Sequence, residues 1–308
     1  MIARIAPWIL PVVAFLAIVI VATIEPRYLS TENLINVVRQ ASPLAIFTLA
    51  QTLPLLTRGL DLSQGGVVVV TSVSAALLSQ SLGTPTAFLI SLLVGTVSGL
   101  CCGSLVAVLR VSPLIVTLGM GSVLSGMALL LSNGQPVSKV GAGFSDLYYA
   151  QLAGIPVPVL LVIALALVLY HVLGRTVTGK YIRAVGSNDR AAWLSGVPVR
   201  FTTILSYVLC GALTSLGAVL LAARISSGHP TVGADTSLQA IAAAVIGGVS
   251  LFGGRGTVLG ALLGALFLGL LSNALNLLNV SSFSQMMVIG AAIVIAVVID
   301  RLRLWGRQ

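Results

Sequence analysis

Two short segments have glycine spacings similar to those of phosphate-binding and dinucleotide-binding loops. Residues 174–181, GRTVTGKY, match the G-x-x-x-x-G-K spacing of a phosphate-binding loop. Tyr181 stands where that loop needs a Ser or Thr for Mg²⁺, and the segment follows an apolar stretch instead of a strand. Residues 254–260, GRGTVLG, likewise lack the strand–turn–helix setting of a dinucleotide site. We predict that neither segment binds a nucleotide.

Catalytic and metal-binding constellations are not indicated either. His171 and His229 are isolated, and the three cysteines lie in apolar segments without metal-ligand or disulfide-framework spacing. A nucleophile paired with a base is not apparent in the sequence. We expect a chain that is not an enzyme and that holds no metal and no cofactor of its own.

Polar residues inside apolar stretches are a third kind of candidate. Residues 58–66, RGLDLSQGG, place Asp61 and Ser63 between two nearly uncharged segments. They are expected either to cap the following helix or to form a broken-helix element near a substrate path or gate. Gln51, Asn273 and Asn276 also lie in apolar segments, where they either hydrogen-bond neighbouring helices or line a hydrated route.

Composition identifies the medium that surrounds these residues. Of the 308 residues, 57% are hydrophobic and only 7% are charged, whereas soluble domains carry roughly 25% charged residues. The chain is therefore predicted to be an all-α, polytopic membrane protein with a single domain over residues 1–308. About ten segments are apolar enough to span a bilayer: 8–24, 41–57, 66–82, 86–109, 112–132, 157–174, 202–224, 238–252, 257–278 and 282–299.

The distribution of basic residues predicts the orientation. If all ten segments cross and both termini are cytoplasmic, twelve of the 16 Lys and Arg residues fall on the cytoplasmic side. This bias follows the positive-inside rule. The net charge of +9 is then a consequence of topology, and nucleic-acid binding is not expected. The spans hold no charge near their midpoints, which argues against a cation-coupled carrier.

Glycines spaced four residues apart predict close helix packing. Such spacing puts them on one helix face, where a neighbouring backbone can approach. The expected partner is another helix of the same chain, or alternatively a second copy. The two sets are Gly95, Gly99 and Gly103, and Gly256, Gly260 and Gly264.

The longest cytoplasmic connection, about residues 175–201, is expected to contain a short exposed helix. Residues 187–194 begin with Asn188 or Asp189 as an N-cap, and Gly196 and Pro198 follow as stop signals. Such a loop either only connects two spans or offers a docking surface to a partner.

Four motifs together resemble the membrane subunit of bacterial ABC importers of the ribose/monosaccharide type. They are GLDLSQGG (59–66), VSPLIVTLGM (111–120), VGSNDRAAWLSGV (185–197) and GGVSLFGGRGTVLGALLGALFLGLLSNALNLLNV (247–280), and the likeness runs from about residue 28 to 303. One departure is Arg58, where the sugar-type pattern often begins Gly-Gly-Ile-Asp.

The resemblance implies a permease of the bacterial inner membrane that carries a small sugar delivered by a periplasmic binding protein. It also implies a second permease copy or paralogue, and two ATPase subunits that bind ATP and Mg²⁺. By the same resemblance, the helix near 186–196 couples to the ATPase through Gly186, Asn188, Ala191, Ala192, Ser195 and Gly196. A permease for branched-chain amino acids or another small solute stays open, as does, less favoured, an ATP-independent channel or carrier.

Overall fold

The computed structural model describes residues 23–281 together with residue 21 and residues 283–288, 290–291, 294 and 298. In this part the chain is predominantly helical, as predicted. Among the described residues, five helices are long and apolar enough to cross a membrane. The predicted span 8–24 falls largely outside the described residues and 282–299 falls partly outside them, as do both chain ends. The five helices are α4 (Thr84–Ala107), α5 (Pro113–Ser132), α7 (Val157–Arg175), α10 (Val199–Ile225) and α12 (Val258–Leu277).

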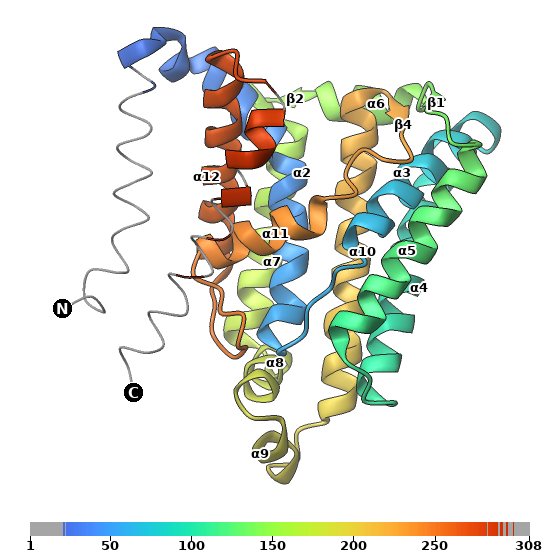
Figure 1. Ribbon diagram of the computed structural model, residues 1–308, viewed down its shortest axis with the longest axis vertical. Helices are drawn as coiled ribbons and strands as arrows, with labels where there is room; N and C mark the ends of the chain where they lie inside the picture. The colour runs from blue at the N-terminus through green and yellow to red at the C-terminus, as the bar shows by residue number, and fades with distance from the viewer. Residues whose placement is uncertain are drawn as a thin grey trace.

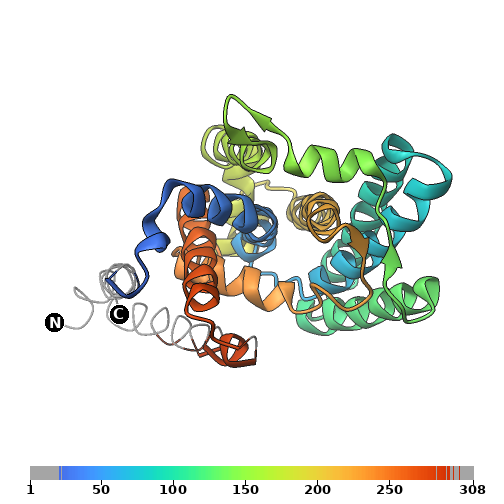
Figure 2. The same ribbon diagram turned by 90° about the horizontal axis from the view of Figure 1, so that it is seen from above.

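The long helices run side by side along the long axis of the molecule (Figure 1). In the centre, α10 packs against α4, α2 (Thr31–Leu56) and α3 (Gln64–Ser81) (Figure 2). One end of the bundle carries α8 (Val177–Ser187) and α9 (Asp189–Leu194), and we call it the α9 end. The opposite end, the α6 end, carries η1 (Pro26–Leu29) and α6 (Ala142–Tyr149).

Four two-residue strands qualify the all-α prediction. At the α6 end β1 (Val137–Ser138) pairs antiparallel with β4 (Ser227–Gly228), and β2 (Gln151–Leu152) pairs with β3 (Ile155–Pro156). These ladders tie connections between helices and do not form a layer of their own, so the architecture remains a helix bundle.

Two helices begin inside the bundle instead of at its ends. Gly66, in the first turn of α3, lies against the backbone of Gly121, near the middle of α5. The second helix, α11 (Thr236–Ile246), has 11 residues and lies across the bundle at mid-height (Figure 1). Eleven helical residues extend only about 16 Å, roughly half of a hydrocarbon core. The predicted span 238–252 is therefore wrong, because α11 ends at Ile246 and irregular chain follows.

The segment that contains this short helix nevertheless runs from one end of the bundle to the other. The chain leaves β4 at the α6 end, passes through α11, and reaches the α9 end in the loop before α12 (Figure 1). Irregular chain and a half-helix together cover the length of the bundle that a full span was expected to cover.

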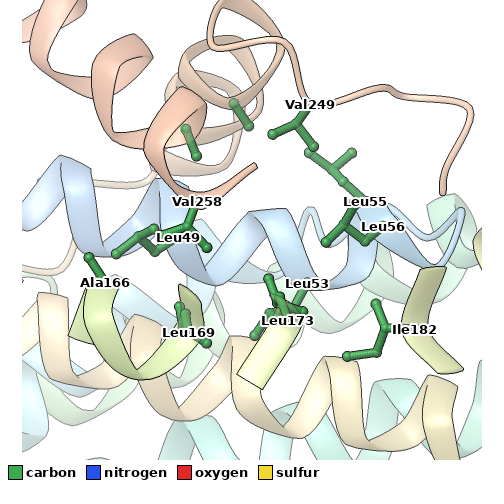
Figure 3. Packing of buried hydrophobic residues seen from close by; sticks show 12 residues of the cluster. Leu49, Leu53, Leu55, Leu56, Ala166, Leu169, Leu173, Ile182, Val249 and Val258 are labelled. Atoms are coloured by element: carbon green, nitrogen blue, oxygen red, sulfur yellow. The ribbon is translucent and has the colours of Figure 1, made fainter. Parts of the chain in front are cut away.

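An apolar cluster joins α2 to the segments at the α9 end. Four leucines of α2 pack against α7, α8 and the segments on either side of the loop before α12 (Figure 3). The cluster includes Leu49, Leu53, Leu55 and Leu56 of α2, Ala166, Leu169 and Leu173 of α7, Ile182 of α8, Val249 and Val258. Leu53, Leu55, Leu56 and Ile182 are fully buried. The first turns of α12 and the middle of α8 thus rest on the end of α2.

The predicted glycine faces pack within the chain. Gly95 and Gly99 of α4 meet the backbone of α10, where a Cβ would collide with the carbonyl oxygens of Gly211 and Tyr207. Gly103 also faces α10, with Ile204 Cα 2.9 Å from the position of a Cβ. These faces are covered by a helix of the same chain, which leaves them no room to meet a second copy.

The second glycine set is placed differently from the prediction. Gly260 and Gly264 of α12 press against the backbone of Gly247 and Ala243, at the end of α11. Gly256 does not belong to this face, because it precedes α12 and lies in the loop with a φ of 157°. The four-residue spacing continued past the start of the helix by coincidence of sequence.

Candidate functional site

Residues 57–63, which we call the Asp61 loop, connect α2 to α3 through the interior of the bundle. Asp61 is 2% exposed. Its Oδ1 accepts a hydrogen bond from the Ser63 backbone N–H (2.9 Å) and another from the Ser63 hydroxyl. In the part of the chain that the structure describes, no cation neutralises this carboxylate. A buried, unpaired charge is costly, so hydrogen bonds must hold it.

The backbone of the loop is held by three helices. With its amide oriented to satisfy both partners, Gln51 of α2 donates to the Asp61 carbonyl (3.1 Å) and accepts from the Asp61 N–H (3.2 Å). The Leu60 carbonyl accepts from Thr117 Oγ1 of α5 (3.2 Å) and from the Tyr207 hydroxyl of α10 (3.4 Å). Irregular backbone at this depth is tolerated because protein groups satisfy it.

The predicted cap at the start of α3 is made differently from expected. Ser63 occupies the N-cap position, but its side chain makes no capping hydrogen bond. Asp61 instead closes an Asx-type turn two residues ahead, onto the Ser63 N–H. Gln64 follows and donates to the Phe47 carbonyl (2.9 Å) and to Thr214 Oγ1 (3.0 Å), which anchors the first turn of α3 between α2 and α10.

The first turns of α3 and α11 meet in the middle of the bundle. Ser237 Oγ of α11 accepts from the Gly65 N–H (2.8 Å) and donates to the Leu62 carbonyl (3.1 Å). A Cβ at Gly65 would collide with the Ala234 carbonyl, so only glycine allows this approach. The positively polarised N-terminal ends of α3 and α11 therefore both lie near the buried carboxylate of Asp61.

Both interpretations of RGLDLSQGG describe part of this arrangement. Asp61 does cap the entry to α3, and the element is also a broken helix deep in the bundle. Of the five residues predicted for a path or gate, Gln51, Asp61 and Ser63 come together here.

Asn273 and Asn276 lie elsewhere, in the last turns of α12. Asn273 exchanges two hydrogen bonds with Asn33 of α2 (2.9 and 3.0 Å), and Asn276 accepts from Gln285 (2.9 Å). A polar pair between two helices is the hydrogen-bonding alternative for such residues. Neither contacts the Asp61 loop.

At the α9 end, the predicted short helix is confirmed as α9. Asn188 is its N-cap, and its Oδ1 accepts from the Ala191 N–H (2.9 Å). Gly196, with a φ of 80°, ends the turn that follows. Trp193 and Leu194 are 67% and 73% exposed. Large apolar side chains on a short, polar-capped helix form a surface suited to a partner.

The six residues predicted to couple to an ATPase fall into two groups. Asn188, Ala191, Ser195 and Gly196 are exposed on α9 or just after it. Ala192 is buried against Val185 and Val197, and Gly186 is buried against α2. Gly186 and Ala192 therefore support α9 from beneath and present no surface of their own. Their coupling to an ATPase stays a prediction.

A cavity of about 1260 Å³ opens beside α9, between α10 and the turn joining α4 to α5. Its wall includes four arginines and two exposed aromatic residues of the α9 end: Arg58, Arg110, Arg190, Arg200, Trp193 and Phe201.

Several residues of the site escaped prediction. Tyr207, Thr117 and Ser237 are polar residues in largely apolar segments, and Gln64 stood within the quoted motif. The available signal was that polarity, since a polar group in a membrane helix needs a partner.

Comparison with known proteins gives this arrangement a family. The profile of the family described as "Branched-chain amino acid transport system / permease component" matches residues 33–297. The chain belongs to this permease family. Its relatives include the ribose import permease protein RbsC of Escherichia coli K12, 40% identical over 92% of this chain and 90% of that protein.

Two further permeases extend the likeness. RbsC of Bacillus subtilis is 36% identical over 93% of this chain and 90% of that protein. The fructose import permease protein FrcC of Rhizobium meliloti is 36% identical over 92% of this chain and 80% of that protein. No solved structure matches the chain.

Proposed function

We propose that this chain is the membrane-spanning permease subunit of an ATP-driven ABC importer for a small sugar of the pentose or hexose class. The observation that carries the proposal is the similarity, over more than nine-tenths of the chain, to permeases named for ribose and fructose import. The bundle supports it, because the described residues include five helices apolar enough to cross a membrane and a broken-helix junction of the kind that transporters place near their substrate.

The same proposal assigns the partners and the location. The chain lies in the bacterial inner membrane with α9 in the cytoplasm and both termini on that side, and about ten segments cross. Arg110, Arg175, Arg190 and Arg200 support this orientation, because all lie at helix ends or turns of the α9 end. Two ATPase subunits with ATP and Mg²⁺ dock at α9. A second copy or paralogue completes the path, and a periplasmic protein delivers the sugar.

In this mechanism the chain performs no covalent chemistry. ATP binding closes the ATPase pair, and α9 transmits the closure to the bundle. The broken-helix junction at the Asp61 loop serves as a gate in the alternating-access cycle. Its support is the set of long-range hydrogen bonds to Leu60, Asp61 and Leu62, which allow the loop to move only together with α5, α10 and α11.

Co-purification and ATP hydrolysis test the proposal. The chain, expressed with its candidate ATPase, is expected to form a stable complex whose hydrolysis rate rises when sugar-loaded binding protein is added. A chain that never retains an ATPase would overturn the importer. Solute flux in vesicles without ATP would instead indicate a channel or carrier.

A second substrate class has one specific observation in its favour, since the matching family is described by branched-chain amino acids. Equilibrium binding of pentoses, hexoses and branched-chain amino acids to the partner binding protein separates the two classes. Binding of an amino acid alone would overturn the sugar assignment and leave the importer intact.

A further inference from the structure

The end of α8 meets α2 and the loop before α12 in an unusually close backbone junction. A Cβ at Gly186 would collide with the Leu56 carbonyl oxygen of α2 and would lie 2.6 Å from the Gly254 nitrogen. The Gly254 N–H donates to the same Leu56 carbonyl (3.0 Å). Ser187, the next residue of α8, lies against Gly254. Three segments thus touch through backbone atoms at one point, where there is no soft side chain to absorb a displacement.

This junction is rigidly connected to α9. Ile182 of α8 is fully buried in the apolar cluster at the end of α2. On the other side, Val185 of α8 packs with Ala192 of α9 and with Val197 after it. Arg183 adds a polar tie, because its Nη1 donates to the Gly256 carbonyl (3.0 Å). A displacement of α9 must therefore move α8 and the 250–256 loop together.

From the junction, one segment of chain reaches both ends of the Asp61 loop. At the α9 end, Arg58 Nε donates to the Phe252 carbonyl (2.9 Å), and the Arg58 stem lies against Gly253. At mid-bundle, Ser237 of α11 bonds the Leu62 carbonyl and the Gly65 N–H. Residues 236–256 therefore hydrogen-bond to both ends of the Asp61 loop.

Arg58 is held in the left-handed region with a φ of 62°, which non-glycine residues avoid. The conformation aims its side chain at Phe252. Glycine adopts this backbone without strain, whereas here an arginine occupies it and adds a side-chain bond to the loop before α12.

We propose that Gly186, at the junction with Leu56 and Gly254, is the positioning residue through which movement of α9 reaches the Asp61 loop. Arg58 strengthens this connection through its hydrogen bond to the Phe252 carbonyl. The inference rests on the proposed function. It assigns Gly186 to transmission inside the permease, where the sequence suggested contact with the ATPase.

The test uses the complete transporter reconstituted in vesicles, with ATPase and binding protein. Three quantities are measured: retained ATPase per permease, ATP hydrolysis with and without loaded binding protein, and sugar moved per ATP. Gly186→Ala forces α8 away from α2. Gly174→Ala, also at the α9 end, is the matched control because a Cβ there meets open space. Trp193→Ala serves as the docking variant.

Gly186→Ala is expected to retain ATPase and basal hydrolysis like Gly174→Ala, while sugar moved per ATP falls about tenfold, within the usual range of coupling between sites. Trp193→Ala should instead lose ATPase. Normal sugar moved per ATP in Gly186→Ala would overturn the proposal, and so would loss of ATPase matching that of Trp193→Ala.

Arg58→Gly keeps the test decisive if Gly186→Ala does not fold. The Arg58 side chain is exposed and glycine accepts the left-handed backbone, so the fold is expected to persist. Sugar moved per ATP should fall about fivefold, at the low end of such coupling. An unchanged ratio would overturn the proposed link between α9 and the Asp61 loop. Failure of the wild-type complex to couple hydrolysis to uptake would sink the proposed function itself.

Discussion

Replacement of Asp61 separates its role in folding from its role in transport. The carboxylate accepts from the Ser63 N–H at 2.9 Å and from the Ser63 hydroxyl, all in the buried interior. Asp61→Ala leaves the Ser63 N–H without a partner, which costs about 1–3 kcal/mol, and also loses the hydroxyl bond, worth about 1 kcal/mol. We expect Asp61→Ala to destabilise the permease by about 2–4 kcal/mol.

Asp61→Asn is expected to behave differently. Its amide oxygen accepts from the same two donors, and a neutral side chain avoids the cost of burying an uncompensated charge. Stability should therefore stay within about 1 kcal/mol of the wild type. Ser63→Ala is the matched control, because it removes the hydroxyl bond alone and keeps the N–H bond.

Thermal unfolding of the purified permease in detergent measures these differences. At about 2 °C per kcal/mol for a chain of this size, Asp61→Ala should unfold about 4–8 °C earlier, and Asp61→Asn within about 2 °C of the wild type. Sugar uptake is then measured on the stable variant. Loss of uptake in Asp61→Asn assigns the charge to the gate, and retention leaves Asp61 with a capping role. Equal destabilisation by Asn and Ala would refute the hydrogen-bond reasoning.

Three further substitutions probe other parts of the bundle. Gly99→Ala places a methyl group against the Tyr207 carbonyl and should lower the yield of folded protein severalfold in fluorescence-detected chromatography, whereas Gly126→Ala, with open space around it, should not. Asn273→Ala breaks the reciprocal pair with Asn33 and should lower the free energy of unfolding by about 1 kcal/mol, measured by thermal unfolding. Sugar uptake per folded permease should stay unchanged. A fall in that uptake would instead place Asn273 in the sugar route. Trp193→Ala should weaken ATPase retention about tenfold in pull-down titrations, as truncation of an interface anchor does, and unchanged retention would remove this face of α9 from the docking surface.

Local features of the sequence were sufficient for the parts of the fold that depend on neighbouring residues. Hydropathy over a window of about 20 residues located α4, α5, α7, α10 and α12, because each is long and apolar enough to span a bilayer and satisfies its backbone within itself. The N-cap at Asn188 was equally local, since donor and acceptor are three residues apart.

Depth within the bundle could not be predicted in this way. The apolar segment at 238–252 has the composition of a span, yet α11 stops after 11 residues, and its last turn is packed against α12 through Ala243 and Gly247. Burial of Gly186 and Ala192 was equally hidden, since the short motif around them does not reveal which side chains face α2 or α8.

The amino-acid sequence by itself determined the medium, the expected orientation and the positions where polar residues and glycines would need partners. The tertiary structure alone decided which partners they have. Tyr207 lies 147 residues from Leu60, and Ser237 lies 172 residues from Gly65. Hydrogen bonds over such separations depend on how whole helices pack, and packing is set by the shapes of many side chains at once. RGLDLSQGG therefore predicts a break in the membrane helices. The tertiary structure places that break in mid-bundle between α2, α5, α10 and α11.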